Sequence, residues 1–259
     1  MLKLNYNKNI GQVIYIVEGE KTEVELLQHI FTKILNYNYT TITRGQNSLE
    51  RYQSKTNPNS RIFVINTLNP QISSIKSGKE YLDMLFKTIH NQYNLDVTRA
   101  AVYYIFDRDP KSNPSNIVCE LIGDLKNSRD NDDEMGGLLL ISYPAIEAYL
   151  FECFINNCYS FPITNAKIAK RQVIKFDCKT EKLTAENLLS AAKEMLKSIF
   201  HLSSNQFRIE EIDNFAARNK EIFDYQEDNL LSVDRYILLS LLSISFIDLG
   251  IIEFEQELF

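Results

Sequence analysis

Short apolar runs alternate with amphipathic stretches over the first 155 residues of the chain. The run QVIYIV (residues 12–17) predicts a strand that is covered on both faces, and EKTEVELLQHIFTKIL (20–35) has apolar residues at helical spacing. Further strands are predicted at RIFVINTL (61–68), RAAVYYIFD (99–107) and GGLLLISYP (136–144). Further helices are predicted at KEYLDMLFKTIHNQY (79–93), SNIVCELIGDLKN (115–127) and AIEAYLFECFI (145–155). A polar loop is expected from about Gly45 to Ser60.

This alternation predicts an α/β fold, with a parallel sheet flanked by helices. From about Ala166 onward the pattern becomes mostly helical, and only QVIKF (172–176) resembles a strand. We therefore expect one domain over residues 1–160 and an α-rich C-terminal region over residues 161–259.

The most apolar segment is YILLSLLSISFIDLGII (236–252) near the C-terminus. It is slightly short for a membrane span and contains Asp248 and several serines. We expect a buried C-terminal helix, or one packed against another subunit, and no association with a membrane.

Composition and charge narrow the classes of protein. The chain has 259 residues, 44% hydrophobic residues and a formal net charge of −6, which argues against a protein that coats nucleic acid electrostatically. The charge still allows an enzyme that reaches phosphates through cations and a local basic patch. The four cysteines form no C-x-x-C pair, which argues against structural zinc. The early apolar run is too short for a secretion signal, so free thiols in the cytoplasm are expected.

Acidic residues come directly at the ends of two predicted strands. Glu18 ends the first strand, and Asp107 and Asp109 end the strand in YYIFDRDP (103–110). Ligands bind beyond the carboxyl ends of parallel strands, so these carboxylates converge in one crevice if the strands are neighbours. Two unit charges about 4 Å apart repel by roughly 4 kcal/mol at an effective dielectric near 20, and a divalent cation relieves that repulsion.

Oxygen ligands without His or Cys favour Mg²⁺ or Mn²⁺. Phosphoryl-transfer chemistry, in which one or two metals position an attacking water, follows from such a site. Asp107 and Asp109 could instead cap the turn before Pro110. Glu147, just past the last strand, could be a metal ligand or an ordinary helix acid.

The acids after the first strand have a simpler interpretation as well. Glu20, Glu23 and Glu25 lie in the first turns of the following helix, where acids interact favourably with the helix dipole. For Glu20 and Glu25 we favour that interpretation. Lys21 and Glu25 have the i, i+4 spacing of a surface ion pair.

In these motifs the sequence resembles the TOPRIM domain, the metal-binding fold of topoisomerases, primases and OLD-type nucleases. Glu18 and Gly19 in VEGEKTE (17–23) match its Glu-Gly pair, and Asp107 and Asp109 in FDRDP match its D-x-D. The order of elements fits from about residue 11 to 155. SYPAIEAYL (142–150) is similar to a Ser-x-Pro turn and Glu-bearing helix in the stand-alone TOPRIM proteins of bacterial phage defence, the RloB and AriB type.

The resemblance implies a metal-dependent nuclease, a toxic effector that cuts DNA, tRNA or another RNA, often under the control of a partner ATPase. It implies that Glu18 is a metal ligand or general base, and that Asp107 and Asp109 are metal ligands. Glu23 and Glu147 would support a second metal, and Lys21 or Lys111 would contact the scissile phosphate. Lys111 stands where topoisomerases and primases often have a further Asp, and no zinc module is present, so DNA relaxation is not expected.

The most basic stretch, AKIAKRQVIKFDCKTEK (166–182), lies outside the TOPRIM-like segment. A groove between the two regions would place phosphates near the metals, although such a run is also typical of a solvated face. The candidate nucleic-acid contacts here are Lys167, Lys170, Arg171 and Lys175. The apolar C-terminal helix would be the surface for a partner ATPase or a second copy.

Two other functions fit parts of the pattern. D-x-D after a strand also begins haloacid-dehalogenase-type phosphatases, but there that strand normally comes first in the domain, and RDNDDE (129–134) looks like a loop. The TOPRIM-like core could alternatively be a non-catalytic docking surface, which would work with Glu18 and Asp107 neutralised. GEKT lacks the first glycine of a Walker phosphate loop, so ATP binding of that type is rejected.

Overall fold

The computed structural model describes residues 2–19, 21–44, 47–66, 77–93, 95, 97, 99–110, 113–129, 136–203 and 205–255. Its centre is an eight-stranded mixed sheet in the order β3-β4-β5-β2-β6-β8-β7, with β9 also paired to β8. The strands are β2 (Gln12–Val17), β3 (Tyr37–Arg44), β4 (Asn47–Ser54), β5 (Arg61–Asn66), β6 (Ala100–Asp107), β7 (Lys126–Asn127), β8 (Gly137–Tyr143) and β9 (Leu239–Ser240).

The four central strands, β5, β2, β6 and β8, are parallel, as the sequence predicts. Their apolar runs are buried because helices cover both faces of the sheet. The prediction of a purely parallel sheet is wrong at the edges, where β3, β4, β7 and β9 all pair antiparallel. The loop expected from Gly45 to Ser60 is also wrong: residues 47–54 form β4, whereas Gly45 and Gln46 lie outside the described residues.

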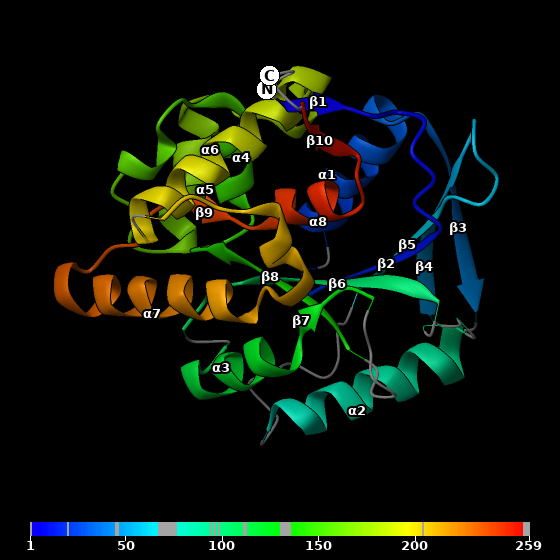
Figure 1. The fold of residues 1–259 in the computed structure, drawn as a ribbon, viewed down its shortest axis with the longest axis horizontal. Coiled ribbons are helices and arrows are strands. Elements are labelled where there is room, and N and C mark those ends of the chain that lie inside the picture. Colours follow the sequence, from blue (N-terminus) through cyan, green and yellow to red (C-terminus); the bar gives the residue numbers. More distant parts are fainter. Residues whose placement is uncertain are drawn as a thin grey trace.

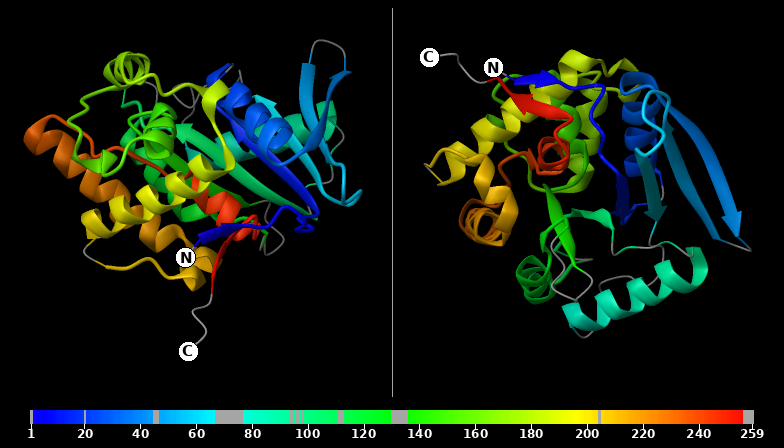
Figure 2. Two further views of the ribbon diagram at one scale, coloured as in Figure 1. Left: turned by 90° about the horizontal axis from the view of Figure 1, so that it is seen from above. Right: turned by 45° about the vertical axis from the view of Figure 1, so that its right-hand side comes forward.

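Helices form a layer on each face of the sheet (Figure 1). α2 and α3 lie on one face, and α1, α4, α6 and α8 lie on the other, an arrangement that the turned views also show (Figure 2). The helices are α1 (Thr22–His29), α2 (Gly78–Thr88), α3 (Ser115–Asp124), α4 (Glu147–Phe154), α5 (Ala166–Lys175), α6 (Ala185–Ser203), α7 (Ala216–Val233) and α8 (Leu242–Asp248). π-helical turns at Ile30–Ile34 and Ile89–Tyr93 extend α1 and α2, and 3₁₀ helices span Cys158–Ser160, Thr180–Lys182 and Ile209–Asn214.

The region after residue 160 is mostly helical, as expected, but two of its elements differ from the prediction. QVIKF is not a strand, because its first four residues complete α5, whose first turn is capped by Asn165 accepting a hydrogen bond from the Ile168 amide at 3.1 Å. The apolar segment 236–252 is not one helix, since it contains β9 and then α8.

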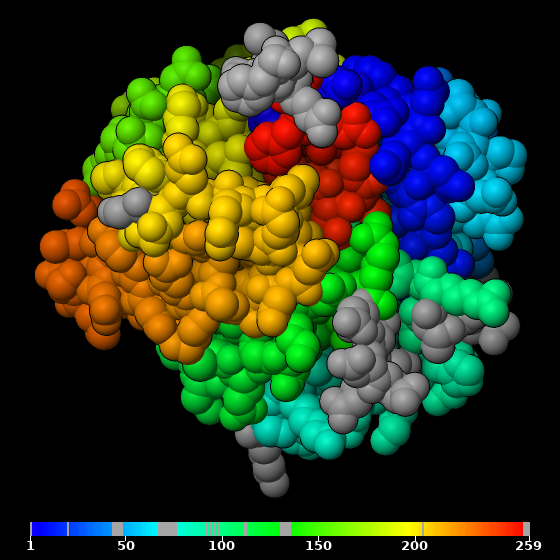
Figure 3. Space-filling model, in the orientation of Figure 1, coloured from blue at the N-terminus to red at the C-terminus, as the bar shows by residue number. Residues whose placement is uncertain are grey.

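Several contacts join the C-terminal region to the rest of the chain. β9 extends the central sheet, and β10 (Ile252–Phe254) pairs with β1 (Leu2–Leu4) in a second, two-stranded sheet. The N-terminal and C-terminal segments consequently meet on the surface (Figure 3). Residues 242–247 of α8 are buried within the chain, so this helix offers no apolar face to a partner. The division into domains at residue 160 stays a prediction.

None of the helices in the described part of the chain is long and apolar enough to cross a membrane.

Candidate metal centre at the carboxyl ends of the parallel strands

The strands that carry the predicted acidic residues are direct neighbours. β2 and β6 pair in parallel with Val17 opposite Ile105. Glu18 and Asp107 therefore lie at the carboxyl ends of two adjacent strands, on the same edge of the sheet. β8 lies on the other side of β6, with Ser142 opposite Asp107, and the chain then enters α4 at Glu147. The sequence-based condition for convergence, that the two strands be adjacent, is therefore met.

Gly19 lets the carboxylate of Glu23 fold back over the turn between β2 and α1. A Cβ atom at position 19 would lie 2.1 Å from Oε2 and 2.4 Å from Oε1 of Glu23, closer than real Cβ contacts allow. Glu23 is nearly enclosed, with 5% of its surface exposed. The Glu-Gly pair thus has a steric reason: glycine makes the room that the second acid occupies.

Asp107 is held by hydrogen bonds from two directions. The backbone amide of Ile146 donates to its Oδ1 at 2.7 Å, which ties the acid to the start of α4. The buried side chain of Asn113 donates from Nδ2 to the Asp107 carbonyl oxygen at 2.8 Å and to Oε2 of Glu18 at 3.1 Å. Asn113 therefore links the ends of β2 and β6 and holds the Glu18 carboxylate close to the Asp107 backbone.

Glu147 is a buried acid with an incomplete set of partners. It is the first residue of α4 and is 4% exposed. Its Oε1 lies 3.6 Å from Nζ of Lys170, an exposed lysine of α5, while its buried Oε2 has no hydrogen-bond partner in the described residues. Glu147 is thus a buried carboxylate rather than an ordinary surface acid of a helix.

All four acids have a raised pKa, and for Asp107 and Glu23 part of the rise comes from the charges of other acids in the cluster. Burial raises the pKa of the carboxyl groups of Glu18, Glu23, Asp107 and Glu147. The pKa of Asp107 lies well above its usual range because burial is reinforced by the charges of the other three. For Glu23 the charges of Glu147 and Glu18 add to burial, whereas the Lys170 ammonium lowers the pKa. Such a group of carboxylates is destabilised in its charged form.

The donor atoms fit a hard divalent cation. The side chains offer carboxylate and amide oxygens, which Mg²⁺ and Mn²⁺ prefer. Oε2 of Glu147 and Oδ1 of Asn113 are buried and have no hydrogen-bond partner among the residues that the structure describes. Within the described residues, however, no three acidic, histidine or cysteine side chains are already arranged to hold a metal ion together. The acids converge on one region without forming a closed set of ligands.

The remaining predicted residues lie at varying distances from this cluster. Asp109 is half-buried in the turn after β6, and its charge raises the pKa of Glu18. Lys21 is exposed and lies 3.8 Å from Glu25, the surface pair that its spacing allows, so its catalytic role stays a prediction. Lys111, like Glu20, lies outside the described residues.

The basic residues of the C-terminal region share the exposed side of α5. Of these residues only Lys170 has a described ion pair with the acid cluster, through Glu147. The others are exposed, and their role as nucleic-acid contacts stays a prediction: Lys167, Arg171 and Lys175.

Sequence reasoning missed three residues that shape this site. They are Asn66, Arg108 and Asn113. Asn66 ends β5 opposite Val17, and its buried Oδ1 has no partner in the described residues. Arg108, between the two aspartates, is 1% exposed and binds Glu227 of α7. An asparagine before Pro114 was readable as a turn signal, but its contact with Glu18 was not.

Comparisons with protein-family models, with curated proteins and with solved structures found no match to the chain.

Proposed function

We propose that the chain is a nuclease, dependent on Mg²⁺ or Mn²⁺, that hydrolyses phosphodiester bonds at the acid cluster. The observation that carries the proposal is the convergence of Glu18, Glu23, Asp107 and Glu147, with the pKa of each raised by burial. A group of buried acids needs a compensating partner, because each buried carboxylate that lacks one costs free energy. A cation bound among them would relieve that cost.

In this proposal Glu18, Asp107 and Asp109 hold the metal, and Glu23 and Glu147 complete its surroundings. A bound divalent cation would polarise a phosphoryl oxygen and lower the pKa of a bound water. Asn113 keeps Glu18 and Asp107 in register through its two hydrogen bonds. The described acids are not yet arranged around a common metal position. Their side chains would therefore turn toward one another as the cation binds.

Lys170 supports a nucleic-acid substrate in preference to a small phosphate ester. Its exposed ammonium lies 3.6 Å from Glu147, and Lys167, Arg171 and Lys175 are exposed on the same helix. A phosphate backbone laid along α5 would therefore lead to the acids, despite the net charge of −6 on the whole chain. A role in phage defence with a partner ATPase is implied only by the motif resemblance and stays a prediction.

Cleavage of a mixed panel (plasmid, single-stranded DNA and total tRNA) with Mg²⁺, Mn²⁺ or EDTA tests this proposal. We expect metal-dependent cutting by the wild type, with rates at least about 10²-fold lower in Glu18→Gln, because a lost metal ligand costs more than the roughly 10–100-fold typical of a lost outer-shell partner. Asp107→Asn should be similarly inactive. Glu25→Gln is the matched control, because Glu25 is an exposed acid of the same helix as Glu23.

Cutting that survives in EDTA or in both variants would contradict the assigned site. A different result would indicate the alternative of a non-catalytic docking protein. In that case the wild type cuts none of the substrates, and its effect in cells is unchanged by the same two substitutions.

A further inference from the structure

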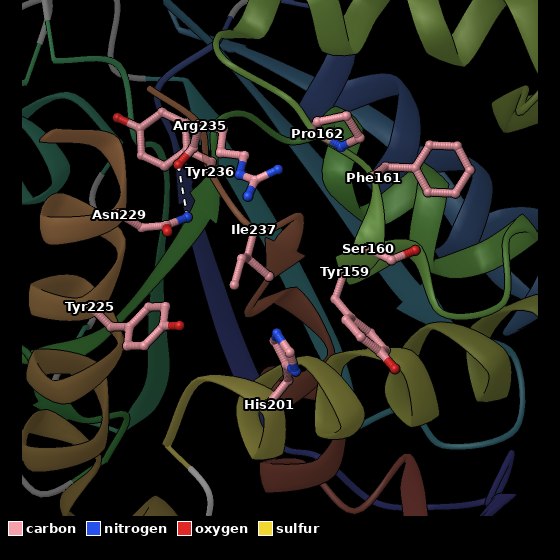
Figure 4. A pocket seen from close by; sticks show the side chains of 10 residues that line it. All are labelled: Tyr159, Ser160, Phe161, Pro162, His201, Tyr225, Asn229, Arg235, Tyr236 and Ile237. Carbon is pink, nitrogen blue, oxygen red and sulfur yellow. Dashed lines mark hydrogen bonds between the residues drawn. The ribbon is translucent and has the colours of Figure 1, made fainter. Parts of the chain in front are cut away.

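A second candidate site lies on the helical side of the molecule. It is a cavity of about 220 Å³ between the end of α6, the end of α7 and the segment that leads into β9 (Figure 4). This volume is below the roughly 300–1,000 Å³ of pockets that enclose a whole small molecule. The side chains that define its chemistry are Tyr159, His201, Tyr225, Asn229, Arg235 and Tyr236.

The walls are aromatic. The rings of Tyr159 and His201 stack with centroids 4.9 Å apart and planes 30° from parallel, so each ring supports the other. Tyr225, which is 41% exposed, comes from α7 on the opposite side, and both it and His201 point toward the middle of the pocket (Figure 4). Flat, partly exposed rings on two sides of a narrow space suit a planar aromatic ligand.

The pocket also presents a cation. Arg235 is exposed, and no acidic side chain among the described residues forms an ion pair with it. Nδ2 of Asn229 donates to the Arg235 backbone oxygen at 3.0 Å, which fixes the bend that carries the guanidinium (Figure 4). An exposed guanidinium without a described ion pair is a good partner for a phosphate group.

Tyr236 connects this pocket to the acid cluster. Its ring forms a wall of the pocket and is 1% exposed, and its hydroxyl has no hydrogen-bond partner in the described residues. Burial raises the pKa of Tyr236, and the charges of Glu227 and Asp109 raise it further while Arg108 lowers it. Tyr236 thus lines the pocket and is close enough to Asp109 to be affected by the charge of this acid.

We propose that this pocket binds a single unpaired nucleotide, with its base between Tyr225 and the Tyr159–His201 pair and its phosphate on Arg235. The cavity has room for one base, aromatic side chains line it from two sides, and the exposed Arg235 guanidinium is available for the phosphate. The choice of a nucleotide within a strand, as opposed to a free mononucleotide, rests on the proposed nuclease function. A base held there would anchor single-stranded nucleic acid beside the acid cluster.

Fluorescence anisotropy with labelled single-stranded RNA and DNA oligonucleotides in EDTA tests this binding without cleavage. We expect Tyr225→Ala to weaken binding by about 5- to 150-fold, the range that corresponds to loss of one base stack. Arg235→Gln should also weaken binding, because it removes the charged contact with the phosphate. Tyr225→Phe, which keeps the ring, should bind like the wild type. Tyr6→Ala is a control, because Tyr6 is an exposed tyrosine that does not line the pocket.

Further measurements distinguish a free mononucleotide from a nucleotide within a strand, and pocket binding from cleavage. Competition by free nucleoside monophosphates as strong as that by the oligonucleotide would assign the pocket to a mononucleotide and overturn the strand-anchoring role. Equal affinities of the wild type, Tyr225→Ala and Arg235→Gln, or no binding by the wild type, would overturn the pocket itself. Asp107→Asn should retain pocket binding, so a failed cleavage assay and a failed pocket are distinguishable.

Discussion

Asp107→Asn is expected to make the metal-free protein more stable and to remove its stabilisation by Mg²⁺. The carboxyl of Asp107 is buried among three other acids, so its charged form is disfavoured in the folded state. Asparagine keeps an oxygen that can accept the hydrogen bond from the Ile146 amide, but it carries no charge. The substitution therefore removes repulsion without removing the main backbone contact of this side chain.

The raised pKa of Asp107 determines the direction in which folding stability changes with pH. A carboxyl whose pKa is raised by folding binds its proton more tightly in the folded state. The contribution of this carboxyl group to the free energy of unfolding is full below its pKa in the unfolded chain, about 4. This contribution is lost as the pH rises through its higher pKa in the folded protein. The wild type without metal should consequently lose stability as pH rises above the ordinary carboxyl range, and Asp107→Asn should lose less.

Thermal unfolding at several pH values, with EDTA or with Mg²⁺, measures both effects. A metal at 100 times its Kd adds about 2.7 kcal/mol, and each kcal/mol corresponds to about 2–4 °C in a protein of about this size. We expect Mg²⁺ to stabilise the wild type by about this amount and not to stabilise Asp107→Asn. A variant that is less stable than the wild type in EDTA, or that gains equally from Mg²⁺, would contradict this account of the acid cluster.

Arg108→Ala should cause the largest loss of folding stability, about 3–5 kcal/mol. The buried guanidinium binds both carboxylate oxygens of Glu227 at 2.8 and 2.7 Å and donates to the Asn113 carbonyl oxygen at 2.8 Å. It also lies 5.4 Å from the ring centroid of Phe223. Alanine would leave Glu227 without its cation and would release Asn113, which holds the Glu18 carboxylate close to the Asp107 backbone.

Urea unfolding of Arg108→Ala, compared with the wild type, measures this loss. Lys220→Ala is the matched control, because it removes a surface ion pair of the same helix, α7, and should cost no more than about 1 kcal/mol. Replacing both partners in Arg108→Met/Glu227→Met should recover part of the stability, since no charge is then left buried alone. An Arg108→Ala variant within 1 kcal/mol of the wild type would show that α7 is held by other contacts.

The parallel centre of the fold could be predicted because its strands are short, continuous apolar runs that need cover on both faces. The edge hairpin could not be predicted in the same way, since β3 and β4 are mostly polar. At the end of β4 burial alternates, with Tyr52 and Ser54 buried and Arg51 and Gln53 more exposed, as in a strand with one solvated face. In α5, the Asn165 cap was a readable signal that outweighed the strand-like residues QVIKF.

The acids of the candidate site could be predicted for a related reason: strand ends are visible in the sequence, and acids there stand out. The contacts that support them were not visible. Arg108 reads as a surface arginine in a turn, and its burial depends on Glu227, 119 residues later. The aromatic pocket likewise combines α6, α7 and the 3₁₀ helix at Cys158–Ser160, whose packing no local pattern reveals.

Equilibrium titration with Mn²⁺, followed by its electron paramagnetic resonance signal, is the most direct test of the metal centre. We expect saturable binding of Mn²⁺ by the wild type, competition by Mg²⁺, and loss of binding in both Glu18→Gln and Asp107→Asn. Glu25→Gln should bind as the wild type does. Undiminished binding in the two cluster variants, or no binding by the wild type at millimolar Mn²⁺, would contradict the assignment of these carboxylates to a metal centre.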